Sequence, residues 1–276
     1  MGVFFASVIT IFWLSHLSYI LYFVQVKPDN PWIYLHILIQ TYLYTGLFIT
    51  GHDAMHGVVA QNRKLNNVFG HIATTLFAFL SFKVLSKKHY LHHRFPATEN
   101  DPDFYTKSNN FILWWFSFMK SYTTWWQILF MAVTFNILLI WFSESQLLVF
   151  WVLPAILSTF QLFFFGTYLP HRQPFTKEMK PHNSRTQPKN HFWAMASCYF
   201  FGYHWEHHQS PTTPWWQLHK IKNKWFHFIA MVTFVLCKND FHLYFQTFKN
   251  QLKQVNNLNL NKIILWKMLF CYCSPF

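Results

Sequence analysis

Long stretches of the chain carry no charged side chain, and their lengths predict where its helices lie. A helix needs about 20 residues to cross the roughly 30 Å hydrocarbon core of a bilayer. Four uncharged runs reach that length, namely residues 3–26, 31–51, 121–143 and 145–171. Short turns at residues 27–29 and at Glu144 join them in pairs, and Pro154 should kink the last run. The pattern therefore predicts four spanning helices arranged as two hairpins.

Three shorter uncharged runs cover residues 69–82, 190–203 and 225–237. Each is too short to cross a bilayer untilted, so we expect interfacial or partly buried helices there. Residues 249–276 have the pattern of a terminal tail. We therefore expect one all-α, membrane-embedded domain over residues 1–276, in which the segments between and after the hairpins form a cap.

Composition and charge place the chain among membrane proteins. Of its 276 residues, 53% are hydrophobic, 22% are aromatic and only 11% are charged. Lys and Arg outnumber Asp and Glu by 22 to 9, which gives a net charge of +13. A basic chain can bind nucleic acid, but these basic residues gather between and after the hairpins, as cytoplasmic loops do. We therefore expect the cap and both termini on the cytoplasmic side, and no nucleic-acid partner.

Histidines supply the candidate chemistry. Nine of the 17 histidines lie at or just beyond the predicted cytoplasmic ends of apolar runs, in the sequences HDAMH, HYLHH, YLPHR and HWEHH. They are His52, His56, His89, His92, His93, His171, His204, His207 and His208. On a helix, positions i+3 and i+4 fall on either side of position i, so an HxxHH box can serve two metal ions. The other eight histidines are isolated and are explained more simply as polar interfacial groups.

Two irons fit this pattern best. Imidazole binds iron, copper, zinc and nickel, and nine imidazoles exceed what one ion can use. Zinc can form all-histidine sites, but paired ions at a lipid boundary favour redox chemistry on an apolar substrate. The chain contains no Glu-x-x-His pair, which excludes the carboxylate di-iron bundle of ferritin-like proteins. A bis-histidine haem protein would need facing histidines inside its spanning helices. Only His16 and His36 lie inside spanning runs of this chain.

Several carboxylates accompany the histidines. A ligating histidine usually donates its second ring N–H to an acceptor, and an all-imidazole site leaves the metal charge uncompensated. Asp53, Asp103 and Glu206 lie inside or just after a box and are candidates for this supporting role. Glu99 and Asp101 are further candidates, but a solvated loop explains these two equally well.

Longer motifs give the chain a family resemblance. The strings HDAMHG (52–57), HHRFPATENDPDF (92–104), FFFGTYLPHR (163–172) and YHWEHHQSPTTPWWQL (203–218) resemble the bacterial and cyanobacterial β-carotene ketolases. These enzymes belong to the superfamily of membrane fatty acid desaturases and hydroxylases. The similarity extends over residues 49–218, and the NDPDF and FGTYLPHR strings are more specific than the histidine boxes. Phe200 and Gln209 depart from the family pattern, which bears on substrate range.

The resemblance implies a di-iron oxygenase that uses O2 and two electrons per turnover. It would hydroxylate the C4 methylene of a β-carotene ring twice, and the resulting gem-diol would lose water to give the ketone, leading to echinenone and canthaxanthin. The family's iron ligands correspond to the nine box histidines, with His171 the least regular.

The same resemblance implies a carotenoid substrate, membrane lipid and a reduced ferredoxin or similar electron donor. The basic side chains Lys87, Lys88, Arg94 and Arg172 are candidates for docking an acidic donor, although the positive-inside bias explains them too. Six tryptophans could line a channel for a polyene or form an interfacial belt: Trp114, Trp115, Trp125, Trp126, Trp215 and Trp216.

Other functions stay open on the sequence. A carotenoid hydroxylase or an acyl-lipid desaturase would use the same histidine boxes, but the NDPDF and FGTYLPHR strings favour the ketolase. A histidine-rich metal transporter would need ionisable residues along a mid-membrane path, whereas these spans are nearly free of charge. A non-catalytic membrane sensor does not explain nine histidines.

Overall fold

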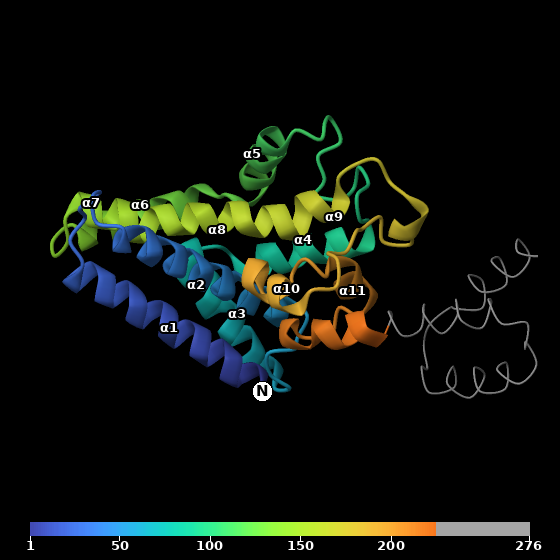
Figure 1. The fold of residues 1–276 in the computed structure, drawn as a ribbon, viewed down its shortest axis with the longest axis horizontal. Coiled ribbons are helices and arrows are strands. Elements are labelled where there is room, and N and C mark those ends of the chain that lie inside the picture. The colour runs from blue at the N-terminus through green and yellow to red at the C-terminus, as the bar shows by residue number, and fades with distance from the viewer. Residues whose placement is uncertain (225–276) are drawn as a thin grey trace, which may run out of the picture. The chain divides into compact units, whose positions relative to one another are not determined.

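The computed structural model describes residues 1–224, and every regular element in that part of the chain is helical. Met1–Lys222 form one compact unit (Figure 1). The all-helical prediction is confirmed for the described residues. The helix predicted at residues 225–237 and the tail predicted at residues 249–276 lie outside them, so the single-domain organisation stays a prediction.

The first predicted hairpin is present. Helices α1 (Gly2–Phe23) and α2 (Trp32–Met55) are each long and apolar enough to cross a membrane. Helix α2 continues one turn past residue 51, so that His52 belongs to the helix rather than to a loop. Ile20 and Leu21 of α1 pack with Ile33 and Ile37 of α2 in a buried cluster near the turn between the helices.

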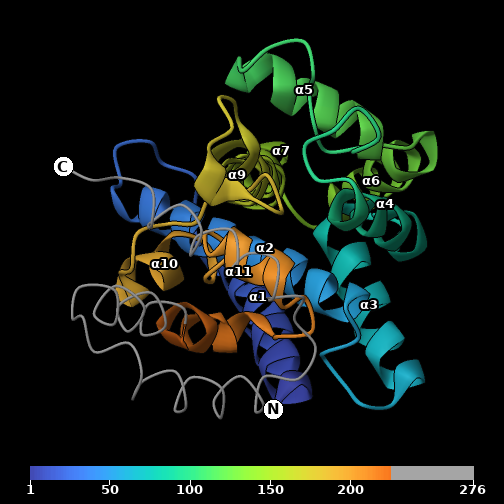
Figure 2. The same ribbon diagram turned by 90° about the vertical axis from the view of Figure 1, so that its right-hand side faces the viewer.

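The last predicted span is also present, as one helix from Glu144 to His171. It comprises α7 (Glu144–Leu147), α8 (Leu153–Phe163) and α9 (Leu169–His171), which are linked by π-helical turns at Leu148–Val152 and Phe164–Tyr168. Pro154 follows the first π turn, which widens the helix where a proline cannot donate a hydrogen bond. Viewed end-on in Figure 2, α7 and α9 lie over one another.

The third predicted span, over residues 121–143, is shorter than its apolar sequence suggested. Its helical part is α6 (Trp125–Leu138), which at about 1.5 Å per residue falls short of a bilayer core. Capping explains the difference. The Thr124 side chain accepts a hydrogen bond from the Gln127 backbone N–H at the start of α6, and the Ser143 side chain caps α7. The length of a run without charged residues does not reveal helix boundaries that are set by capping.

The remaining helices surround one end of these spans. Helix α3 (Arg63–Ala78) packs against α2, and α4 (Phe82–Arg94) is bent from α3 by 100°. The interfacial helices predicted at residues 69–82 and 190–203 correspond to α3 and α10 (His191–Cys198). Helix α5 (Phe111–Tyr122) was not predicted. Figure 1 shows α4, α9, α10 and α11 (His204–Gln209) gathered at one end of α1, α2 and α8.

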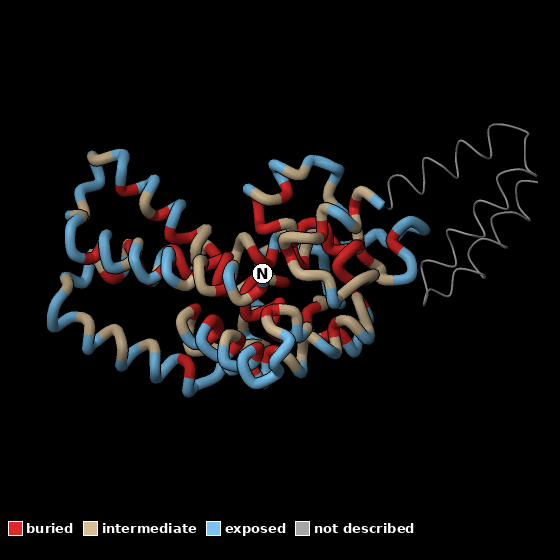
Figure 3. The backbone as a smooth tube through the Cα atoms, turned by 90° about the horizontal axis from the view of Figure 1, so that it is seen from below, coloured by how far each residue is buried: buried red, intermediate tan, exposed pale blue. Residues whose placement is uncertain are grey.

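Burial distinguishes the two ends of the unit. Large apolar side chains are exposed on the long helices, such as Ile11, Phe12 and Leu38, and on α6, such as Ile128, and Figure 3 shows pale-blue exposed positions along these elements. Apolar surface of this extent is suited to lipid rather than water. Three described helices have the length and composition of membrane spans, and the bent α3–α4 pair would make a fourth if counted as one. The chain is therefore a membrane protein.

Candidate metal centre

The nine box histidines converge from four helices. His52 lies in the last turn of α2 and His56 just after it, His89, His92 and His93 lie on α4, His171 ends α9, and His204, His207 and His208 lie on α11. These histidines are far apart in the sequence but close in the fold, because α4 and α11 meet the end of α2, and α9 meets α4 and α11. The structure thus brings together every histidine that the sequence predicted for the site.

The histidines form two groups of four. The first holds His52, His56, His89 and His207, and the second holds His92, His171, His204 and His208. Within each group the candidate ligand atoms all lie within 4.8 Å of one another. In the first group, His56 Nε2 is 2.7 Å from His89 Nε2. In the second, His208 Nε2 is 3.1 Å from both His92 Nε2 and His204 Nε2.

His93 lies between the two groups. Its Nε2 atom is 3.1 Å from His89 Nε2 and 2.9 Å from His207 Nε2, both of the first group. Its ring centroid is 4.3 Å from that of His208, which belongs to the second group. His93 can therefore complete the first group as a fifth ligand. Both HxxHH boxes serve both groups, since His89 and His207 belong to one while His92, His204 and His208 belong to the other.

The arrangement fits metal ions. Seven of the nine histidines approach one another through Nε2. Nε2 of His52 and of His171 are buried without any hydrogen-bond partner among the described residues. Such orphaned atoms are costly unless something binds them. Imidazole nitrogens held at about 2.0–2.1 Å from one ion lie about 3 Å apart, which is the spacing seen here.

Two of these rings are oriented by hydrogen bonds from Nδ1. His92 Nδ1 lies 3.0 Å from both carboxylate oxygens of Asp101, and His171 Nδ1 lies 2.9 Å from the backbone oxygen of Asn183. If Nδ1 carries the proton in each ring, Nε2 is left unprotonated and faces the group. This is the arrangement that ligating histidines adopt.

The acidic residues named from the sequence differ in their placement. Asp53 is buried, with Oδ1 3.8 Å from His52 Nδ1 and Oδ2 accepting a hydrogen bond from the Trp215 backbone N–H. Asp103 Oδ2 is 3.8 Å from His92 Nδ1, and the Tyr122 hydroxyl donates to its Oδ1. Both carboxylates therefore lie beside the histidine groups, at distances longer than a direct hydrogen bond to a ring.

Glu206 makes different contacts. Its carboxylate pairs with Lys222 Nζ at 3.1 Å and accepts a hydrogen bond of 2.6 Å from the Thr186 hydroxyl. Lys222 Nζ also donates to the Thr186 hydroxyl oxygen at 2.7 Å. The structure thus brings Glu206, inside the HWEHH box, together with Lys222 and Thr186 rather than with a histidine.

Burial sets the charge of the site. Desolvation and the neighbouring histidines hold the pKa of His204, His207 and His208 well below the usual value, so these rings are neutral with lone pairs available. For Asp101, burial alone would raise the pKa. His92 and the backbone N–H groups of Ala97 and Asp103 outweigh burial and hold the pKa below its usual value. Asp101 is therefore a carboxylate that offsets positive charge next to His92.

An apolar cavity of about 280 Å³ reaches the histidines. Its lining includes His52, His89, His92 and His204, and the Phe201 ring centroid lies 5.0 Å from that of His52. Phe48, Phe77, Met131, Ile156 and Leu162 are among the apolar side chains that form its walls. Of the six tryptophans suggested for a channel, only Trp115 lines this cavity. An apolar molecule can therefore be held against the two histidine groups with little water beside it.

Sequence reasoning missed several contributors. It weighted Asp103 above Asp101, yet Asp101 makes the direct bonds to His92. Asn183 contributes a backbone oxygen, which no side-chain pattern can reveal. His182 was left out, yet its ring lies 5.6 Å from that of His208. His16 and His36, also left out, lie away from the boxes: His16 Nε2 is 3.2 Å from His36 Nδ1, and His16 Nδ1 is 2.6 Å from Gln40 Oε1.

Comparison with known proteins adds to this geometry. The fatty acid desaturase family model matches residues 29–133 and 115–237. The chain is 42% identical over 186 residues to a zeaxanthin 4-ketolase of Chlamydomonas reinhardtii, covering 66% of this chain and 42% of the relative. It is 40% identical over 198 residues to β-carotene 4-ketolase 3 of Haematococcus lacustris, covering 67% of this chain and 61% of that relative.

A bacterial relative is covered more fully. A β-carotene ketolase of Paracoccus sp. is 35% identical over 215 residues, which cover 77% of this chain and 88% of the relative. The chain therefore spans less than two thirds of the two algal relatives but most of this bacterial one. No solved structure matches the chain.

Proposed function

Because the chain belongs to the fatty acid desaturase family, as a relative of its β-carotene ketolases, we propose that it is a di-iron oxygenase that ketolates the ring C4 position of β-carotene. The observation that carries this proposal is the apolar cavity whose lining includes four box histidines. A hydrocarbon ring that enters the cavity meets the metal-binding groups directly. The C4 hydrogens are a sensible target because they are allylic to the polyene.

The nine histidines would hold two irons, one in each group of four, with His93 assigned to the first. When bound, the irons supply the capacity to activate O2 with two electrons. The overall change is ring CH2 + O2 + 2 electrons + 2 H⁺ giving ring CHOH + H2O. A second cycle at the same carbon gives a gem-diol, which loses water to form the ketone.

The chain's own residues position the reactants. Asp101 and the Asn183 backbone oxygen orient His92 and His171. Phe201 and Phe163 line the cavity together with histidines of both groups and would limit how a ring can lie against them. The apolar walls exclude water, which protects reactive species from side reactions. A cavity of about 280 Å³ is at the small end of ligand sites, so the polyene would extend beyond it into lipid.

The orientation proposed from charge is that the histidine cap and the N-terminus face the cytoplasm. The segments that carry α4, α10 and α11 contain most of the basic side chains, while the turns at the opposite end contain only Lys27, Asp29 and Glu144. A reduced ferredoxin or similar carrier would then deliver the electrons from the cytoplasmic side.

Expression in a bacterial host that accumulates β-carotene tests the proposal. We expect mono- and diketo products with C4 carbonyl groups, resolved by chromatography of the extracted pigments. Unchanged carotene from a folded and iron-loaded protein would overturn the assignment. Products hydroxylated at C3 would favour a hydroxylase instead.

A further inference from the structure

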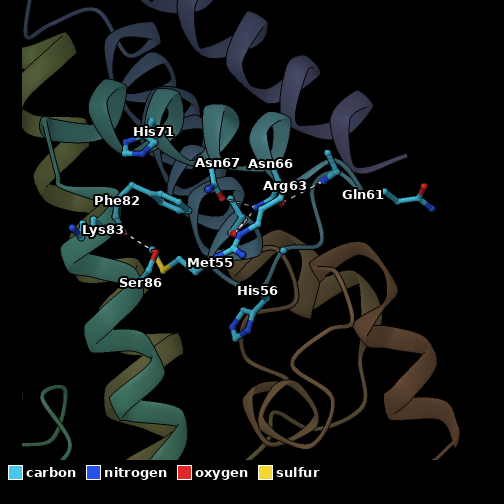
Figure 4. Close-up of a pocket in the computed structure, with 13 residues that line it drawn as sticks. Met55, His56, Gln61, Arg63, Asn66, Asn67, His71, Phe82, Lys83 and Ser86 are labelled. Atoms are coloured by element: carbon cyan, nitrogen blue, oxygen red, sulfur yellow. Dashed lines mark hydrogen bonds between the residues drawn. The ribbon is translucent and has the colours of Figure 1, made fainter.

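A second cavity, of about 680 Å³, lies between the end of α2, α3 and the start of α4. Figure 4 shows His56 below this cavity, Arg63 reaching down from α3, and Lys83 on the α4 side. The His56 ring belongs to the first histidine group, where its Nε2 lies 2.7 Å from His89 Nε2. A molecule in this cavity would therefore be one imidazole away from the metal-binding site.

The charge of this cavity is one-sided. Its lining includes the cations Arg63 and Lys83 and the polar side chains of Gln61 and Asn67, and it includes no carboxylate. Within residues 1–224, neither Arg63 nor Lys83 forms an ion pair. Lys87 follows Lys83 by one helical turn and shares its face of α4. The cavity thus offers an exposed positive rim to an acidic partner.

The walls are fixed in place. Asn66 donates to the Ala54 backbone oxygen at 2.8 Å, and its side-chain oxygen accepts from the Val59 and Ala60 backbone N–H groups. These bonds hold the loop that follows His56 against α3. On the other side, Phe82 packs so closely on Gly70 that a Cβ there would lie 2.4 Å from its ring. The cavity is therefore a preformed surface feature.

The exposed apolar side chains of α3 lie on a different face. Arg63, Asn67 and His71 recur every four residues and line the cavity. The apolar residues Leu65, Val68 and Ile72 are 42%, 51% and 42% exposed and point away from it. That apolar face is suited to lipid, whereas the cavity lies on another face of α3 and is lined by the exposed cations Arg63 and Lys83. This arrangement favours a soluble partner over a lipid headgroup.

Other basic residues considered for docking are already engaged. Lys88 Nζ donates to the Ser121 backbone oxygen and lies 4.7 Å from the Tyr122 ring. Arg94 and Arg172 lie over the rings of Phe95 and Tyr168. Arg63, Lys83 and Lys87 are the cations best placed to meet a partner near the metal-binding groups.

We infer that this cavity is the docking site of a small acidic iron–sulfur electron carrier, and that electrons enter through His56. The inference rests on the proposed oxygenase function. Each docking event would oxidise the carrier's reduced cluster by one electron and reduce the metal centre by one electron. Two such events supply the two electrons that one hydroxylation consumes.

The test is direct binding of a plant-type [2Fe–2S] ferredoxin to the full chain, iron-loaded in lipid nanodiscs without carotenoid. The variant Arg63→Glu/Lys83→Glu should raise the Kd at low salt about tenfold or more, because it places like charges across the interface. The control Lys107→Glu/Lys120→Glu makes the same change in net charge away from the cavity. It should change the Kd less than about twofold, because long-range steering is shared over the whole basic surface.

Equal weakening by both variants, or no weakening by the first, would overturn the inference. Iron content and reduction by dithionite should be unchanged in both variants, which separates docking from damage to the site. If the reversal variant fails to fold, Arg63→Gln/Lys83→Gln should still weaken binding severalfold, and unchanged binding would count against the site. Normal ferredoxin binding by either cavity variant with loss of binding to anionic vesicles would assign the cavity to a lipid headgroup.

The binding assay contains no carotenoid, so its result is separate from the proposed function. A binding shift in a chain that leaves β-carotene unchanged would support the docking site and contradict the ketolase assignment. Ketone formation without the shift would contradict only the docking site.

Discussion

At the scale of single residues, the site depends on the groups that orient its histidines. Eight of the nine histidines could be selected from sequence spacing, because repeated HxxHH and HxxxH boxes are rarely accidental, whereas His171 stands alone and was selected by its position at the end of an apolar run and by the family resemblance. Their partners could not be ranked in the same way. Asp101 and Asp103 differ by two positions in one loop, and only the folded loop shows that Asp101 makes the direct bonds to His92.

Replacing Asp101 with Asn should weaken iron binding about 10- to 100-fold, because the carboxylate fixes the His92 ring and offsets metal charge. The measurement is iron retained by the purified protein after dialysis against graded chelator. Glu99→Gln is the matched control, since Glu99 is an exposed acid in the same loop. Equal retention in the two variants would show that Asp101 has no part in the metal centre.

At the scale of elements, the site depends on how helix ends are shaped. The π turn at Phe164–Tyr168 sets the direction of the last turn, which carries His171 into the second histidine group. Gly166 within it makes room for the Phe201 ring, since a Cβ at Gly166 would lie 2.0 Å from Phe201 Cε1. Phe201 in turn contacts His52 and lines the apolar cavity.

Gly166→Ala should therefore push Phe201 into the cavity. We expect ketone formation to fall about tenfold or more while iron content is retained, because over-packing of this kind costs about 1–3 kcal/mol. Pigment chromatography and metal analysis of the same preparation measure the two effects. The double variant Gly166→Ala/Phe201→Leu should recover much of the activity; if it stays as inactive as the single variant, the clash is not the cause.

The third histidine box is anchored by a buried ion pair. Lys222→Met would leave Glu206 buried without its cation, which typically costs about 3–5 kcal/mol, and this should lower the thermal stability of the protein in nanodiscs. Lys222→Met/Glu206→Gln removes both charges and should restore most of that stability. If both variants have the same melting temperature, well below that of the unmodified chain, Lys222 stabilises the protein through packing rather than through its ion pair with Glu206.

The helix boundaries show what the hydropathy pattern could and could not provide. Uncharged length located α1, α2 and the helix Glu144–His171, because burying charge in lipid is costly whatever the local geometry. It failed for residues 121–143, where Thr124 and Ser143 act as caps inside an uncharged run. It also missed α5, which is apolar but only 12 residues long and is interrupted by Lys120 in its last turn. Capping and turn geometry are local effects that a charge count does not register.

At the scale of the whole molecule, the fold divides one chain into a lipid-facing half and a polar half. The spanning helices carry exposed apolar side chains, and their ends bring the histidine boxes together. One cavity approaches these histidines from among apolar side chains and the other from a basic surface. This separation suits an oxygenase that must take its substrate from lipid and its electrons from solution.

In the proposed reaction, the chain inserts oxygen from O2 at C4 of a β-carotene ring. The most direct test supplies ¹⁸O2 to β-carotene-accumulating cells that express the iron-loaded chain, followed by mass spectrometry of the rapidly extracted pigments. We expect C4 ketones that carry one ¹⁸O per carbonyl group. Unchanged β-carotene, or ketones whose oxygen comes only from water, would contradict the claim.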